Sequence, residues 1–200
     1  LTFHEVYASS ASELVTELLQ YTEVEPKLNT LEAEALYAGI MMDTKNFTFK
    51  TGVRTFEAAA YLRRAGAEVT RVRKLLRDNM EAYKARAEVV REAEVYKGAF
   101  AISVCPADNL ESPTIVGAQA ANELLNIVGI KASFVLTEYY GKIYVSARAI
   151  DEVNVQIIME RMGGGGHMTM AGCQMDNTGL IEAIGILKHT IDTMLDNGEI

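Results

Sequence analysis

Residues 163–167 of the chain are Gly163-Gly164-Gly165-Gly166-His167. Each glycine costs backbone entropy, roughly 0.5–1 kcal/mol relative to alanine, so such a run is typical of a backbone that lies close against another group. Successive free N–H groups can form an anion-binding nest, and the His167 imidazole could bond a phosphate oxygen. We therefore interpret this stretch as a binding loop for a phosphorylated nucleotide. The alternative is a flexible linker, but linkers are usually diluted with Ser.

An earlier segment, residues 142–148, alternates between apolar and polar side chains. If it is a strand, its apolar residues face one side, and Tyr144, Ser146 and Arg148 face the other. Arg148 could hold a phosphate by its fork of donors, and Ser146 could do so by its hydroxyl. An exposed polar face would explain the same alternation equally well.

Around these two motifs the sequence predicts a small mixed α/β domain. Ser112-Pro113 has the residues of a helix start, and Tyr140-Gly141 those of a hairpin turn. The expected strands are Ala99–Cys105, Ala132–Glu138 and Lys142–Arg148, and the expected helices begin at Ser112 and cover Asp151–Met162 and Thr178–Leu195.

The first eighty residues predict helices with clear start signals. Ser10 with Glu13, and Asn29 with Glu32, have the spacing of capping boxes. The second of these helices would run to Asp43. The first helix would bury one apolar face, formed by Leu14, Val15, Leu18 and Leu19. Two more helices are expected, over Thr55–Ala65 and Thr70–Asp78.

The segment from Glu81 to Tyr96 has a narrow apolar stripe among charged residues, which is typical of an exposed connecting helix with one packed side. We therefore expect three parts: a helical part at 1–80, a connecting helix at 81–97 and a second domain at 98–200. The fold class is α/β.

Composition limits the kind of ligand. The net charge is −8, which argues against a long non-specific nucleic-acid groove but leaves room for a small anion held by local positive groups. Cys105 and Cys173 lie far apart in apolar contexts, so we expect two buried thiols. No apolar run approaches the length of a membrane span.

Asp43 ends an apolar helix, where a carboxylate is unfavourable beside the negative end of the helix dipole unless a cation compensates. Hard divalent cations prefer carboxylate oxygens, so Asp43 is a candidate metal ligand. A simple C-terminal turn with Thr44 explains the local sequence better. Asn46, Arg54 and Ser9 are further candidates for contact with a ligand.

Six short motifs carry a resemblance to a known family. Those of the first part are Tyr7–Leu18, Gly39–Phe47 and Arg54–Ala59, and those of the second part are Ser146-Ala147-Arg148, Gly163–His167 and Ala171-Gly172. Together they resemble the DHH phosphoesterase superfamily, and within it they resemble most the membrane-anchored bacterial cyclic-di-AMP phosphodiesterases. The resemblance implies the C-terminal part of a DHH domain followed by a DHH-associated C-terminal domain.

The resemblance also implies a two-manganese hydrolase that opens cyclic di-AMP, a signalling nucleotide, to the linear dinucleotide pApA. Asp43 matches a metal-binding aspartate of the DHH domain. Ser146, Arg148 and the stretch from Gly163 to His167 match the substrate-holding part of the second domain. The parent is expected to be membrane-anchored, with this part in the cytoplasm.

The sequence departs from that family pattern because it contains no Asp-His-His string. We expect the missing ligands to lie upstream of Leu1. One carboxylate cannot hold two metals, so the chain by itself is expected to bind nucleotide without hydrolysing it. We also expect an uncovered apolar face on the first helices, buried by self-association into a homo-oligomer or by other sequence.

Other functions stay open at this point. A short-oligonucleotide hydrolase and a single-strand exonuclease of the same superfamily are the nearest alternatives. A non-catalytic nucleotide- or nucleic-acid-binding module and a purely structural dimerisation domain are the others.

Overall fold

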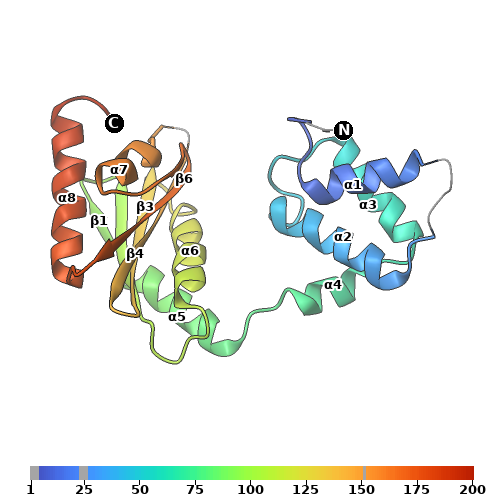
Figure 1. Cartoon of the computed structure of the whole chain (residues 1–200), viewed down its shortest axis with the longest axis horizontal. Helices are drawn as coiled ribbons and strands as arrows, with labels where there is room; N and C mark the ends of the chain where they lie inside the picture. The colour runs from blue at the N-terminus through green and yellow to red at the C-terminus, as the bar shows by residue number, and fades with distance from the viewer. Residues whose placement is uncertain (1–4, 23–26, 151) are drawn as a thin grey trace. The chain divides into compact units, whose positions relative to one another are not determined.

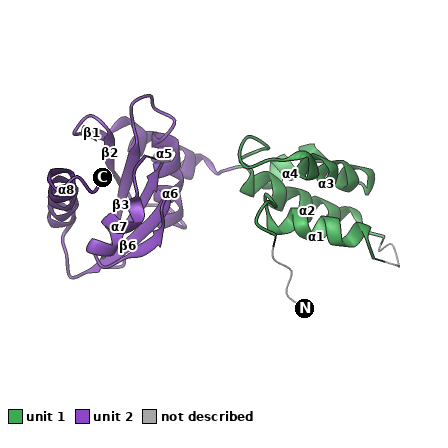
Figure 2. Ribbon diagram, turned by 90° about the horizontal axis from the view of Figure 1, so that it is seen from above, with its two compact units in different colours: residues 1–77 green, residues 78–200 purple. Residues whose placement is uncertain are grey.

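The computed structural model describes residues 5–22, 27–150 and 152–200. The chain forms two compact units, residues 1–77 and 78–200, each with its own core (Figure 2). The division falls earlier than the expected boundary near residue 97, because the helix assigned to a connection packs with the second unit.

The described residues of the first unit form four helices: α1 (Ala11–Gln20), α2 (Thr30–Asp43), α3 (Val53–Arg64) and α4 (Val69–Leu75). The Ser10 hydroxyl accepts the Glu13 amide at 3.0 Å, which confirms the predicted N-cap. Asn29 and Glu32 form a complete capping box, also as predicted. The side chain of Glu13 instead accepts from the amide of Ser9, so the first capping box is incomplete.

The packing of α1 differs from the prediction. Its buried residues are Glu13 and Thr16, whereas Val15 and Leu18 of the predicted apolar face are 44% and 41% exposed. On α3 the Phe56 side chain is 55% exposed as well. The polar side of α1 therefore packs in the unit, whereas its apolar face is covered only in part, with Leu14 and Leu19 half-buried.

The second unit is built on one mixed six-stranded sheet with the order β1-β2-β3-β4-β6-β5 (Figure 1). Strands β2 and β3 are parallel, and the remaining neighbours are antiparallel. Its elements are α5 (Met80–Arg91), β1 (Glu94–Tyr96), β2 (Phe100–Cys105), α6 (Pro113–Leu124), β3 (Ala132–Tyr139), β4 (Lys142–Ala149), α7 (Val155–Arg161), β5 (Gly165–His167), β6 (Met170–Asp176) and α8 (Leu180–Asp196).

The predicted strands and helices of this unit are confirmed, with three corrections. The expected helix at 81–96 ends at Arg91, and its last residues form β1. The helix expected from Asp151 begins at Val155, and Asp151 itself lies outside the described residues. Strands β5 and β6 were not predicted, because short strands rich in glycine carry no clear apolar alternation.

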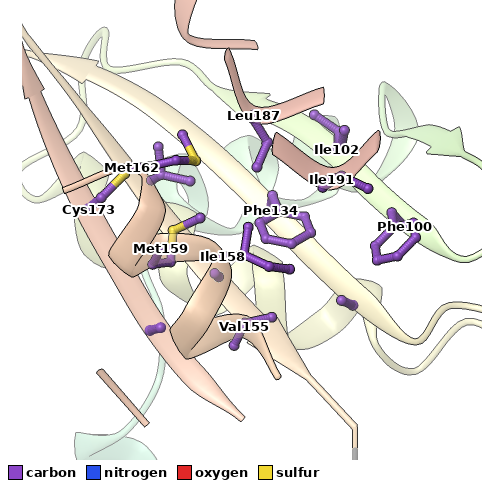
Figure 3. Close-up of a cluster of buried hydrophobic side chains, with 14 of the residues drawn as sticks. Phe100, Ile102, Phe134, Val155, Ile158, Met159, Met162, Cys173, Leu187 and Ile191 are labelled. Atoms are coloured by element: carbon purple, nitrogen blue, oxygen red, sulfur yellow. The ribbon is translucent and has the colours of Figure 1, made fainter. Parts of the chain in front are cut away.

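Helices cover the two faces of the sheet with two separate cores. On one face, α7 and α8 pack over a large cluster that includes Phe134, Ile158 and Leu187 (Figure 3). On the other face, α5 and α6 pack over a smaller cluster that includes Ala101 and Val135. The sheet is therefore a layer between two helical layers.

Arg86 ties α5 to α6. It is 8% exposed and pairs with Asp78 at 2.6 Å and with Glu123 at 3.1 Å, and its guanidinium donates to Gln119 at 2.9 Å. This network explains why α5 packs as part of the second unit.

Both cysteines are buried free thiols, as predicted. Burial raises the pKa of Cys105 and of Cys173 to about 11, so both stay protonated near neutral pH. Among the described helices, none combines the length and the apolar character that a membrane span requires.

Candidate functional site

The face of the sheet that carries α5 and α6 is covered over only part of its width. The buried cluster beneath these helices takes its sheet residues from β2 and β3, namely Ala101, Cys105 and Val135. Among the described residues, none of its buried members comes from β4, β5 or β6. Helix α6 also contacts β4, but it has no comparable contact with β5 or β6, and this part of the face, on β4, β6 and β5, is called the open face.

Strand register decides which side chains lie on the open face. Ser146 pairs with Gly172, which pairs with Gly165. Arg148 pairs with Met170, which pairs with His167. Directly paired residues point to the same face, and neighbouring strands are about 4.8 Å apart.

The structure therefore brings together four residues that the sequence singled out separately. Ser146 and Arg148 on β4 share the open face with Gly165 and His167 on β5, two strands away and thus at roughly 10 Å. Within the described part of the chain, the side chains of Ser146 and His167 form no hydrogen bond.

Arg148 differs from the other charged groups of this face, Lys142 and Asp176, which pair with each other at 3.1 Å. Arg148 is half-buried, and its Nη1 donates to the Ala147 carbonyl at 2.9 Å. Its Nε is buried without any hydrogen-bond partner, and the guanidinium pairs with no carboxylate of the described residues. Burial lowers the pKa of Arg148. A desolvated and unpaired cation is costly, and a bound anion would satisfy it.

The glycine run is part of the fold rather than a loop of free amides. Both of the first two amides donate to carbonyls of α7: Gly163 to Glu160 at 3.0 Å, and Gly164 to Met159 at 2.8 Å. The predicted nest is therefore wrong for these two residues. Strand β5, which starts at Gly165, is the edge of the sheet, and an edge strand leaves part of its backbone N–H and C=O groups unpaired.

Two of the four glycines are required by close packing against β6. A Cβ at Gly164 would lie 2.7 Å from the Cα of Cys173 and closer still to the carbonyl oxygen of Gly172. A Cβ at Gly166 would lie 2.5 Å from the Cα of Ala171, and its φ is +150°. At Gly165 a Cβ would meet nothing within 4 Å, because it would point to the open face.

Tyr144 is a further residue of the open face that the sequence reasoning did not select as a site. It is half-buried and pairs with Gln174 of β6. Because it is two residues before Ser146 in the strand, it points to the same face. The alternation of residues 142–148 had already placed it beside Ser146 and Arg148, and that signal could have identified it. An aromatic ring there offers a flat surface on which a base can stack.

In the first unit, Asp43 is the exposed last residue of α2, and the hydroxyl of the next residue, Thr44, donates to the Ile40 carbonyl at 2.6 Å. In the described parts of the chain, no three His, Cys, Asp or Glu side chains come together as ligands of a metal ion. The described residues therefore do not by themselves fit a manganese centre.

Two of the other candidates have protein partners. The Ser9 hydroxyl and amide both bond the Glu13 carboxylate. The Arg54 guanidinium pairs with Glu17 at 2.6 Å and with Glu5 at 3.3 Å. Because these groups are already satisfied, we do not keep Ser9 and Arg54 as binding residues.

Comparison with known protein families identifies a domain within the second unit. Residues 99–195 match the DHHA1 domain. The second unit therefore contains a DHHA1 domain. Strands β4, β5 and β6, which form the open face, lie within the matched residues.

Two curated relatives are similar along the chain. The cyclic-di-AMP phosphodiesterase GdpP of Bacillus subtilis is 44% identical over 200 residues, which is 99% of this chain and 30% of the relative. The cyclic-di-AMP phosphodiesterase PdeA of Listeria monocytogenes is 42% identical over 193 residues, 96% of this chain and 29% of the relative. The chain thus spans less than a third of the length of either relative.

A solved structure supports the fold. An exopolyphosphatase-related protein from Bacteroides fragilis superposes with a TM-score of 0.86 over 97% of this chain and 59% of that one. The two share 21% sequence identity, so this likeness concerns the fold alone.

Proposed function

We propose that the open face of the DHHA1 domain holds the phosphates of a nucleotide substrate. The observation that carries the proposal is Arg148: a half-buried guanidinium with an unpaired Nε, on the same face as Ser146, Gly165 and His167. A charge-assisted hydrogen bond to phosphate would offset the desolvation of this cation.

Each residue of the face has a distinct part in this proposal. Arg148 binds phosphate oxygens through its fork of donors, and the Ser146 hydroxyl and the His167 imidazole donate from either side. Gly165 keeps the surface free of side-chain atoms, so the ligand can approach the backbone of the edge strand. Tyr144 stacks against a base.

The substrate we propose is cyclic di-AMP, opened to pApA by the longer protein to which this chain corresponds. Relatives named as cyclic-di-AMP phosphodiesterases, similar over nearly the whole chain, support this choice. In the longer protein we expect two manganese ions, with Asp43 as one ligand, in a cytoplasmic part of a membrane-anchored parent. The described residues of this chain contribute substrate binding and no complete metal centre.

Calorimetry of the chain with cyclic di-AMP in the presence of manganese tests this proposal, with pApA and a short oligonucleotide as competing ligands. We expect cyclic di-AMP to bind, and chromatography of the recovered nucleotide to show no conversion to pApA. Tighter binding of the oligonucleotide than of cyclic di-AMP would favour an oligonucleotide hydrolase instead. No heat with any of the three ligands would reject a nucleotide-binding role.

A further inference from the structure

The first unit contains a second concave site. A cavity of about 630 Å³ lies beside the C-terminal end of α2, between that end and the segment of α4. Four basic side chains line it: Lys45, Arg73, Lys74 and Arg77. The polar groups of Asn46 and Thr70 line it as well, and no carboxylate does so among the described residues.

Among the described residues, these four cations have no carboxylate partner. In a protein with a net charge of −8, acidic partners are abundant, yet none of the four forms an ion pair with a described residue. The Lys45 ammonium lies 5.4 Å from the ring centroid of Phe49, and this is a weak contact for a charged group. Like charges gathered around one cavity repel one another, and an anion placed among them would remove that repulsion.

The backbone beside the cavity is held in an uncommon conformation. Lys45, Asn46 and Phe47 are consecutive left-handed residues with φ of 47°, 59° and 64°. Each such non-glycine residue costs roughly 1–2 kcal/mol. The ring of Phe47 packs between two other rings, and its centroid lies 5.7 Å from the ring centroids of both Tyr37 and Phe56, which fixes the turn.

The consequence of this turn is that Lys45 and Asn46 line the cavity. Thr70, Arg73 and Lys74 have the i, i+3, i+4 spacing of one face of α4, and Arg77 follows beyond the C-terminal end of that helix. Strain that the surrounding packing maintains is typical of ligand sites.

We propose that this cavity binds a phosphorylated ligand of about mononucleotide size, at a site of its own in the first unit. Its volume lies in the range of small-molecule sites, roughly 300–1,000 Å³. The cations and Asn46 bind the phosphates. Met41, Met42 and Leu76, which line the apolar part, contact the nucleoside. A nucleoside diphosphate combines the two chemistries.

A purely structural role is the competing explanation. Arg73 and Lys74 stand in the last turn of α4, where cations stabilise the negative end of a helix dipole. This explanation expects a loss of thermal stability when the charges are removed, and no binding of any phosphate compound.

The test uses the whole chain carrying Arg148→Gln, which removes the cation of the open face, so that failure of the proposed function and failure of this proposal are separable. Calorimetry at low ionic strength compares ADP, pyrophosphate and adenosine. On this background we expect ADP to bind more tightly than pyrophosphate, and adenosine to give no measurable heat. Absence of ADP binding, or equal binding of adenosine, overturns the proposal.

Charge-removal variants locate the site. Arg73→Gln with Lys74→Gln is expected to weaken ADP binding by about tenfold or more. The matched control Lys27→Gln with Arg64→Gln removes two exposed cations of the same unit outside the cavity, and its ADP affinity should stay within about twofold. If thermal melting shows that the first pair does not fold, Lys45→Gln replaces it with the same expectation. Equal losses in variant and control would mean non-specific charge attraction and would contradict the proposal.

Discussion

Replacing Arg148 by glutamine is expected to weaken the binding of cyclic di-AMP by about ten- to a hundredfold, because a hydrogen bond to a charged group contributes roughly 1.5–3 kcal/mol. Stability is expected to stay the same or to rise. The unfolded chain solvates the guanidinium fully, whereas the folded chain buries its Nε without a partner. Calorimetry gives the affinity, and thermal melting gives the stability of the same sample.

The matched control is Arg161→Gln on α7. Arg161 is paired with Glu199 and lies in the same unit. The Arg161→Gln substitution removes the same charge from the chain and should leave the affinity for cyclic di-AMP unchanged. If Arg148→Gln kept full affinity, or lost it together with stability, the assignment of Arg148 as a phosphate-binding residue would be wrong.

Substitutions of two adjacent glycines are expected to affect different properties: Gly164→Ala lowers the stability of the fold, and Gly165→Ala lowers the affinity for the ligand. Gly164→Ala places a methyl group 2.7 Å from the Cα of Cys173, and backbone atoms of β6 cannot yield as a flexible side chain would. We expect a loss of about 3 kcal/mol in the free energy of unfolding. Gly165→Ala adds the same methyl group in open space, so its stability should be that of the unchanged chain.

The affinity for cyclic di-AMP also distinguishes the two variants. The methyl group of Gly165→Ala lies where the ligand approaches β5, and we expect it to lower the affinity for cyclic di-AMP by about tenfold. Denaturant unfolding and calorimetry on both variants measure the two effects. A stable Gly164→Ala would contradict the packing of Gly164 on β6, and unchanged affinity in Gly165→Ala would remove β5 from the site.

Much of the second unit was predictable from local patterns. The alternation of residues 142–148 placed Ser146 and Arg148 on one face, and Ser112-Pro113 and Tyr140-Gly141 marked a helix start and a turn that the structure contains. These signals are local, since they depend on residues two to four positions apart.

What the sequence left undetermined depends on contacts between distant residues. The register of β4, β6 and β5 is what brings Gly165 and His167 beside Ser146, and no local pattern encodes that register. The glycine run likewise reflects the packing of Gly164 and Gly166 on β6 as much as any ligand. The apolar spacing in α1 predicted the wrong buried side, since the polar side with Glu13 and Thr16 packs in the unit.

The same reasoning applies to the cations of the first unit. Arg54 resembled a free anion-binding residue in sequence, yet Glu17 and Glu5 neutralise it across the fold. No local sequence pattern distinguishes Arg73 and Lys74, yet in the described structure they line a cavity and pair with no carboxylate. Pairing between charges is a property of the tertiary structure, so composition alone does not identify which cation is available.

The measurement that addresses the central claim most directly is a titration of the nitrogen-15-labelled chain with cyclic di-AMP, followed by amide chemical shifts. We expect the largest changes at Ser146, Arg148, Gly165 and His167, which come from two strands and meet only on the open face. Changes confined to other residues of the second unit, or no changes at all, would contradict the claim that this face binds the nucleotide.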